Sequence, residues 1–117
     1  MISPKFVFIA REVLKFIRNG GKLNYRHLYK DGYCCPLGAV CINAGYENDN
    51  STKSDVIWQN KWYDFAYEKT KLTGSFWCGF DDNYFDGDFT DVELQSRTED
   101  FVIGYKLAQF CKKRNWL

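Results

Sequence analysis

The first eighteen residues carry the periodicity of one amphipathic helix, and both of its ends are marked. Ser3 is a favourable N-cap, and Pro4 suits the first helical position because its missing N–H would have no partner there. The Asn-Gly-Gly sequence at 19–21 ends the pattern, since glycine readily takes the left-handed conformation of a C-cap. Apolar residues recur at helical spacing: Phe6, Ile9, Ala10, Val13, Phe16 and Ile17. We predict a helix over residues 4–18.

Three more helices follow from start and stop signals. Pro36 begins a second helix that ends at Gly45. A capping-box-like sequence at 52–55 opens a third helix to about residue 69. A capping box at 96–99 opens a last helix that runs to about Arg114.

Two stretches lack a helical pattern. Residues 22–33 read as extended or looped, and residues 22–34 are compatible with a small β-hairpin. Residues 76–93 read as irregular and acidic, with at most a short helical turn at the start. We therefore expect one globular domain over residues 1–117. It is mainly α, with about four helices and irregular connections, and α+β is the alternative.

Aromatic residues make up 19% of the 117 residues, which is high. A buried ring removes a large apolar area from water, so a few rings can anchor a small core. Tyr and Trp are also favoured anchors at protein-binding surfaces. Composition does not separate these two uses, and we expect most of the rings in the core because a small fold needs them.

Charge is balanced overall but unevenly distributed. The net charge is +1, which gives no strong attraction to nucleic acid or membrane. Residues 1–30 carry seven Lys or Arg against one acid, whereas residues 76–100 carry one against eight. The basic and acidic blocks are expected to face each other or to face partners.

The five cysteines are odd in number, and the chain begins without the pattern of a signal peptide. No apolar run is long enough to cross a membrane. These features predict a reducing, cytoplasmic location with free thiols, and no membrane partner.

Cys35 is the candidate nucleophile. Pro36 at a helix start would place Cys35 at the N-cap, where helix N–H groups lower a thiol pKa. A nucleophile also needs a base, and His27, the only histidine, could serve with Asp31 orienting it. One Cys and one His without a family signature is a weak pattern, so a cysteine-dependent enzyme is an alternative only.

Metal sites are not expected, and neither is a cofactor. The cysteine spacing lacks the paired knuckles of structural zinc sites. Residues 82–93 align with a calcium-binding EF-hand loop, although Tyr84 stands where an oxygen ligand is expected and Gly79 disrupts the entering helix. The alternative calcium ligands are Asp82, Asp86, Asp88 and Glu93.

Two surfaces could bind macromolecules. Nucleic acid is an alternative partner for a basic strip with Tyr25 and Tyr29 interleaved, formed by Lys15, Arg18, Lys22, Arg26 and Lys30. The leading hypothesis uses an acidic aromatic segment, because charge with aromatic anchors suits protein docking. Its residues are Phe80, Asp81, Asp82, Tyr84, Phe85, Asp86, Asp88, Phe89 and Asp91.

Three stretches carry a resemblance: YCCPLGAVCINAG at 33–45, FWCGFDD at 76–82 and GYKLAQF at 104–110. Together they resemble small accessory proteins of tailed phages and prophages that have a C-x-L-G-A block. The resemblance implies a non-enzymatic inhibitor of the anti-defence, anti-CRISPR-like class, which occludes a bacterial host protein such as a nuclease or defence effector. It implies no catalytic residues.

Overall fold

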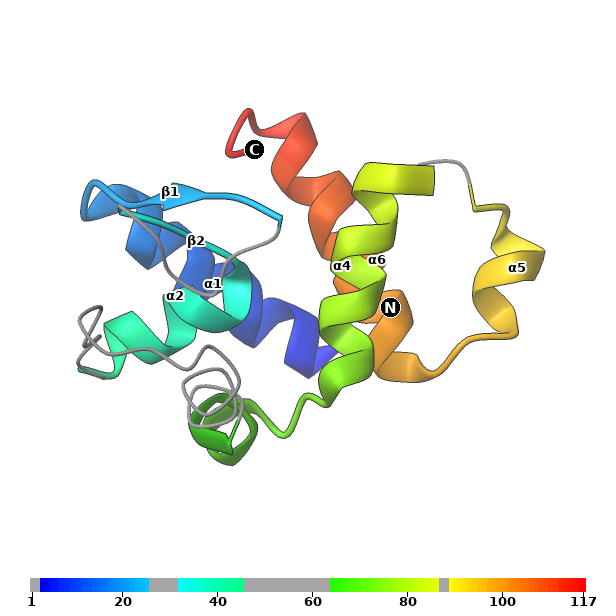
Figure 1. Ribbon diagram of the computed structural model, residues 1–117, viewed down its shortest axis with the longest axis horizontal. Helices are drawn as coiled ribbons and strands as arrows, with labels where there is room; N and C mark the ends of the chain where they lie inside the picture. The colour runs from blue at the N-terminus through cyan, green and yellow to red at the C-terminus, as the bar shows by residue number, and fades with distance from the viewer. Residues whose placement is uncertain (1–2, 26–31, 46–63, 87–88) are drawn as a thin grey trace, which may run out of the picture.

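The computed structural model describes residues 3–25, 32–45, 64–86 and 89–117, with the backbone alone at 84–86. This part of the chain is mainly helical, which confirms the predicted fold class (Figure 1). Its elements are α1 (Pro4–Arg18), β1 (Lys22–Leu23), β2 (Tyr33–Cys34), α2 (Pro36–Asn43), α4 (Gly74–Asp86), α5 (Asp91–Gln95) and α6 (Glu99–Lys113), and residues 64–70 are also helical.

Helix α1 has the predicted ends. The Ser3 hydroxyl accepts a hydrogen bond from the Lys5 amide at 3.2 Å, and Asn19 caps the C-terminus. Gly20 follows with φ +90°, a conformation that favours glycine. A Cβ on Gly21 would overlap the Phe16 ring, so this glycine lets the chain turn tightly over the buried face of α1.

The predicted helix from Pro36 is confirmed, and the last helix is confirmed with a different start. Thr98, not Ser96, is the N-cap of α6, and its hydroxyl accepts from the Phe101 amide at 3.2 Å. Ser96 instead caps the C-terminus of α5. The third predicted helix ends at Thr70, close to the expected residue 69, and its predicted start lies outside the described residues.

The prediction that residues 76–93 are irregular is wrong. Most of the segment belongs to α4, and α5 follows at Asp91. Gly79 does not disrupt a helix but lies inside α4, where a Cβ would overlap the carbonyl oxygen of Phe101. The same holds for Gly104 of α6, where an added Cβ would overlap the carbonyl oxygen of Phe76 on α4. The two glycines allow the backbones of α4 and α6 to touch.

The two short strands pair in parallel, so a β-hairpin is not formed. Lys22 is opposite Tyr33, and Leu23 is opposite Cys34. A hairpin requires antiparallel strands joined by a tight turn. Here both strands run in the same direction, and β2 is followed almost directly by α2.

The main core lies where α1, α2, α4 and α6 meet. α1 packs on α2, and α4 packs on α6, which is the most extensive contact between elements. Each helix contributes fully or almost fully buried side chains, including Ile9, Val13, Leu37, Val40, Phe76, Phe80, Leu107 and Cys111. This confirms that rings such as Phe76 and Phe80 serve the core.

A smaller cluster lies apart from this core. Leu94, Phe101 and Tyr105 are buried together, with Phe89 and Val102 against them. We call residues 89–98 the α5 lobe. It stands at one end of a molecule that measures 43 × 28 × 25 Å (Figure 1).

Asp100 joins three parts of the main body at the start of α6. Its carboxylate accepts hydrogen bonds from the Thr73 amide at 2.9 Å and the Thr73 hydroxyl at 2.8 Å. Lys5 of α1 completes the set with an ion pair at 3.5 Å. Among the described residues, no helix combines the length and apolar character needed to cross a membrane.

Candidate functional site

Cys35 occupies the predicted N-cap of α2, but its environment is not that of an activated thiol. Its Sγ accepts a hydrogen bond from the Gly38 amide at 3.4 Å. The side chain is 0% exposed. Burial, with Cys34 beside it, raises the thiol pKa well above the ordinary value and outweighs the helix N–H groups. The expected lowering of this pKa is therefore wrong.

The other buried thiols are similar. Burial raises the pKa of Cys41 and of Cys111 to about 12, and it also raises that of Cys34. Cys78 on α4 is the exposed cysteine. His27 and Asp31, the proposed base and its orienting group, lie outside the described residues.

The calcium loop considered as an alternative at residues 82–93 does not have an EF-hand conformation where the structure describes it. Its first five positions, including Asp82 and Asp86, belong to α4, and Glu93 belongs to α5. An EF-hand loop has to wrap around the ion, which a straight helix cannot do. Asp88 lies outside the described residues. In the part of the chain that the structure describes, no three His, Cys, Asp or Glu side chains gather as metal ligands.

The acidic aromatic segment does not form one docking surface, because two of its rings are used internally. Phe80 is 0% exposed and lies 5.1 Å from the Tyr25 ring, measured between centroids. Phe89 stacks on Phe101 and Tyr105, with centroid distances of 5.9 and 5.2 Å. Phe80 is therefore wrong as an exposed anchor, and Phe89 is half-buried against its own fold.

The remaining members of that segment are divided. Asp81 and Asp82 are half-buried on α4, and Asp91 is exposed on α5. Tyr84, Phe85 and Asp86 lie in the last turn of α4, where only the backbone is described. Of the predicted contact residues whose side chains are described, Asp91 is the exposed one.

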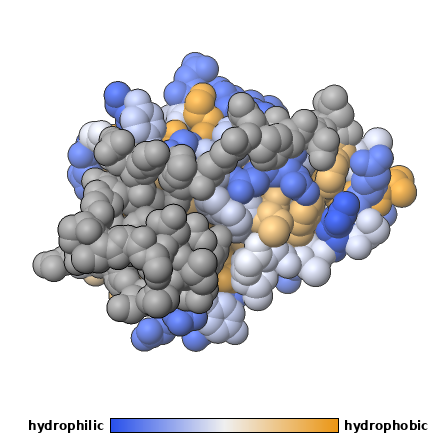
Figure 2. Space-filling view, in the orientation of Figure 1, coloured by the Kyte–Doolittle hydropathy of each residue, from blue (hydrophilic) through white to orange (hydrophobic). Residues whose placement is uncertain are grey.

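The α5 lobe presents an apolar side chain that the sequence reading missed. Val92 is 75% exposed, and the exposed Asp91 and Glu93 flank it. Figure 2 shows apolar surface at this end of the molecule. Helical spacing could have revealed Val92, because burial of Leu94 directs Val92 to the opposite side of a short helix.

The α5 lobe is fixed by contacts with α6 and by contacts within the lobe. The Phe89 amide donates to the Tyr105 hydroxyl at 2.9 Å, and Leu94 is buried. The Arg97 guanidinium lies over the rings of Phe89 and Phe101, at 5.5 and 5.0 Å from their centroids. Thr90 caps α5 by accepting from the Glu93 amide at 3.2 Å. These contacts fix the edge that carries Val92.

The predicted basic strip is present in part. Lys15 and Arg18 are exposed on α1, and Lys22 on β1 has its ammonium 5.5 Å from the centroid of the Tyr33 ring. Arg26 and Lys30 lie outside the described residues, as does Tyr29. Tyr25 is not free for stacking on a base, because it packs against Phe80 with the Lys112 ammonium over its ring.

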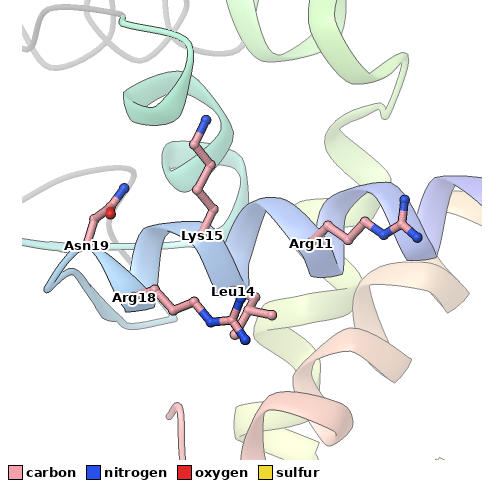
Figure 3. A pocket seen from close by; sticks show the side chains of 5 residues that line it. All are labelled: Arg11, Leu14, Lys15, Arg18 and Asn19. Atoms are coloured by element: carbon pink, nitrogen blue, oxygen red, sulfur yellow. The ribbon is translucent and has the colours of Figure 1, made fainter.

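One further cationic side chain and one polar side chain extend this strip beyond the prediction. Arg11 and Asn19 join Leu14, Lys15 and Arg18 around an open hollow on α1 (Figure 3). The sequence signal for Arg11 was its spacing of four residues before Lys15, which places both on one helix face.

Comparison of the chain with protein-family models, with curated proteins and with solved structures finds no significant match.

Proposed function

We propose that this protein is a non-enzymatic binding protein, and that the exposed edge of α5 contacts its partner. The observation that carries the proposal is Val92, which is 75% exposed between two exposed carboxylates. An exposed apolar group gains free energy when a partner covers it, at about 25 cal/mol per Å². The flanking carboxylates select a partner with positive charge nearby.

The packing of aromatic rings against α5 also supports a binding role for this edge. Phe89, Phe101 and Tyr105 stack below α5, so the edge is preorganised and little ordering entropy is lost on association. Because Phe80 is buried and Phe89 is half-buried against its own fold, the contact surface is smaller than the sequence suggested and is centred on Asp91, Val92 and Glu93.

The proposed partner is a bacterial host protein with a basic surface, such as a nuclease or another defence effector. The resemblance to phage accessory proteins supports this choice, and so does the acidic edge, because proteins that handle nucleic acid present basic clefts. In this proposal the protein acts in the host cytoplasm and inhibits by occlusion. A cysteine enzyme using Cys35 would first have to expose a fully buried thiol.

The test is affinity capture from bacterial lysate at two salt concentrations, followed by mass spectrometry and titration of the captured protein. The informative variant is Asp91→Asn with Glu93→Gln. The matched control is Asp64→Asn with Glu68→Gln, which makes the same two changes at exposed positions of another helix. We expect the α5 variant to weaken binding by about tenfold, since rim charges each contribute modestly, and the control to bind normally.

Val92→Asp adds a second arm to the same test. A charge placed in an apolar contact should weaken binding more than the loss of the two carboxylates does. Equal affinity of all variants for one stoichiometric partner would place the contact surface elsewhere. Failure to capture any stoichiometric partner would reject the binding function itself.

A further inference from the structure

Helix α1 runs from the middle of the molecule toward the end opposite the α5 lobe (Figure 1), and its exposed face carries a concentrated positive charge. Arg11, Lys15 and Arg18 are spaced by four and three residues, so they share one face. That face is about 10 Å long, from the rise of 1.5 Å per residue. All three side chains are exposed, and with Leu14 and Asn19 they line the hollow in Figure 3.

The scaffold under this charge is rigid. Ile9, Val13 and Phe16 on the opposite face of α1 are buried in the main core. Glu12, the acidic residue of this helix, already has a partner. The side-chain amide of Asn43 donates to the backbone oxygen of Glu12 at 2.7 Å and to the Glu12 carboxylate at 3.2 Å. Glu12 is therefore turned toward α2, and the described residues that line the hollow include no acidic side chain.

Within the residues that the structure describes, the three cations have no internal counter-charge. Lys5, on the same helix, is paired with Asp100, whereas no ion pair or hydrogen bond joins Arg11, Lys15 or Arg18 to another side chain in the described part of the chain. The C-terminal end of α1 has a partial negative charge of about half an electron, which opposes an anion. Three full positive charges outweigh it.

We propose that this face of α1 binds the phosphate backbone of nucleic acid without sequence preference. The planar guanidinium groups of Arg11 and Arg18 match a phosphate with two parallel hydrogen bonds. Lys15 adds a point charge between them, and Leu14 offers apolar contact to a sugar. This surface is independent of the α5 edge, so the protein can engage a nucleic acid and a protein at opposite ends.

Fluorescence anisotropy with a labelled single strand and a labelled duplex, from 50 to 200 mM salt, tests the proposal. The variant is Arg11→Gln with Lys15→Gln and Arg18→Gln. The control is Lys69→Gln with Lys106→Gln and Lys113→Gln, which removes the same charge from exposed positions on other helices. Glutamine keeps a high helix propensity, so both proteins should melt like the wild type.

We expect the α1 variant to lose more than about tenfold in affinity at low salt and the control to lose much less. On duplex, the slope of log affinity against log salt should become shallower by about 0.9 for each phosphate contact removed. Equal losses in variant and control would overturn the proposal, because net charge alone would then explain the binding. It would equally be overturned if wild type bound heparin or anionic vesicles but neither oligonucleotide at 50 mM salt.

Discussion

The main body and the α5 lobe are stabilised in different ways. In the main body, α4 and α6 approach until Gly79 meets the backbone of Phe101, and α1, α2, α4 and α6 all contribute to one core. The α5 lobe depends on the packing of a few side chains, chiefly Leu94 and the rings of Phe89 and Tyr105. A core of a few side chains opens more easily than one that joins several helices. The comparison indicates that the α5 lobe and the main body differ in local stability, and that the lobe can unfold locally while the body stays folded.

The largest effect is expected at the contact between α4 and α6. Gly79→Ala would place a methyl group on the Phe101 carbonyl, which is backbone and cannot move aside alone. We expect it to lower the free energy of unfolding by about 3 kcal/mol or more, as overpacking against a rigid neighbour does. Urea denaturation followed by circular dichroism measures this change.

Gly74→Ala is the matched control for that substitution. Gly74 begins α4, and a Cβ there would meet no atom within 4 Å. Alanine should be neutral or slightly stabilising because it has the higher helix propensity. Similar destabilisation by both substitutions would mean that the two helices do not touch at Gly79.

The helices α1 and α4 show what the sequence could reveal. α1 has a capping serine, an N-terminal proline and a continuous apolar stripe, so its bounds follow from local signals. α4 has none of these at its start, and Gly79 in its middle resembles a break. Only the backbone of α6 explains that glycine, and a single sequence does not reveal that its partner is Phe101, 22 residues further along the chain.

A smaller and local effect is expected in the α5 lobe. Phe89→Ala removes the ring that stacks on Phe101 and Tyr105, while its amide keeps the bond to the Tyr105 hydroxyl. We expect the half-buried ring to contribute about 2 kcal/mol, less than a fully buried phenylalanine. Hydrogen exchange should show lost protection for the amides of α5 and unchanged protection for those of α1.

Val92→Ala provides the comparison, since this side chain is 75% exposed and supports nothing below it. It should leave exchange in both regions unchanged. If Phe89→Ala lowered protection in α1 as much as in α5, the lobe and the body would unfold as one unit, and the contrast between them would be incorrect.

The candidate sites were only partly predictable for the same reason. Charge and spacing placed Lys15 and Arg18 on one exposed face, because those are local properties of a helix. Phe80 and Cys35 are buried by segments distant in the sequence, and no local sequence pattern predicts such burial. An aromatic residue beside aspartates looks like a docking anchor until the fold buries it.

The smallest effect is expected at Asp100, which joins α1 to the chain before α4. Burial alone would raise its carboxyl pKa, but the hydrogen bonds from Thr73 and the charge of Lys5 outweigh burial and hold the pKa below 3.8. The ionised form therefore favours folding above pH 3.8, and this contribution is lost as pH falls through the folded-state pKa.

Asp100→Asn should lower the free energy of unfolding at pH 7 by about 1.5 kcal/mol. Urea titrations from pH 7 to pH 2.5 should show this deficit shrinking with acid, whereas Glu99→Gln, a matched change at an exposed neighbour, should show little deficit at any pH. A deficit of constant size across the pH range would mean that Asp100 acts by shape and not by charge, and that the body lacks this electrostatic link between α1 and α6.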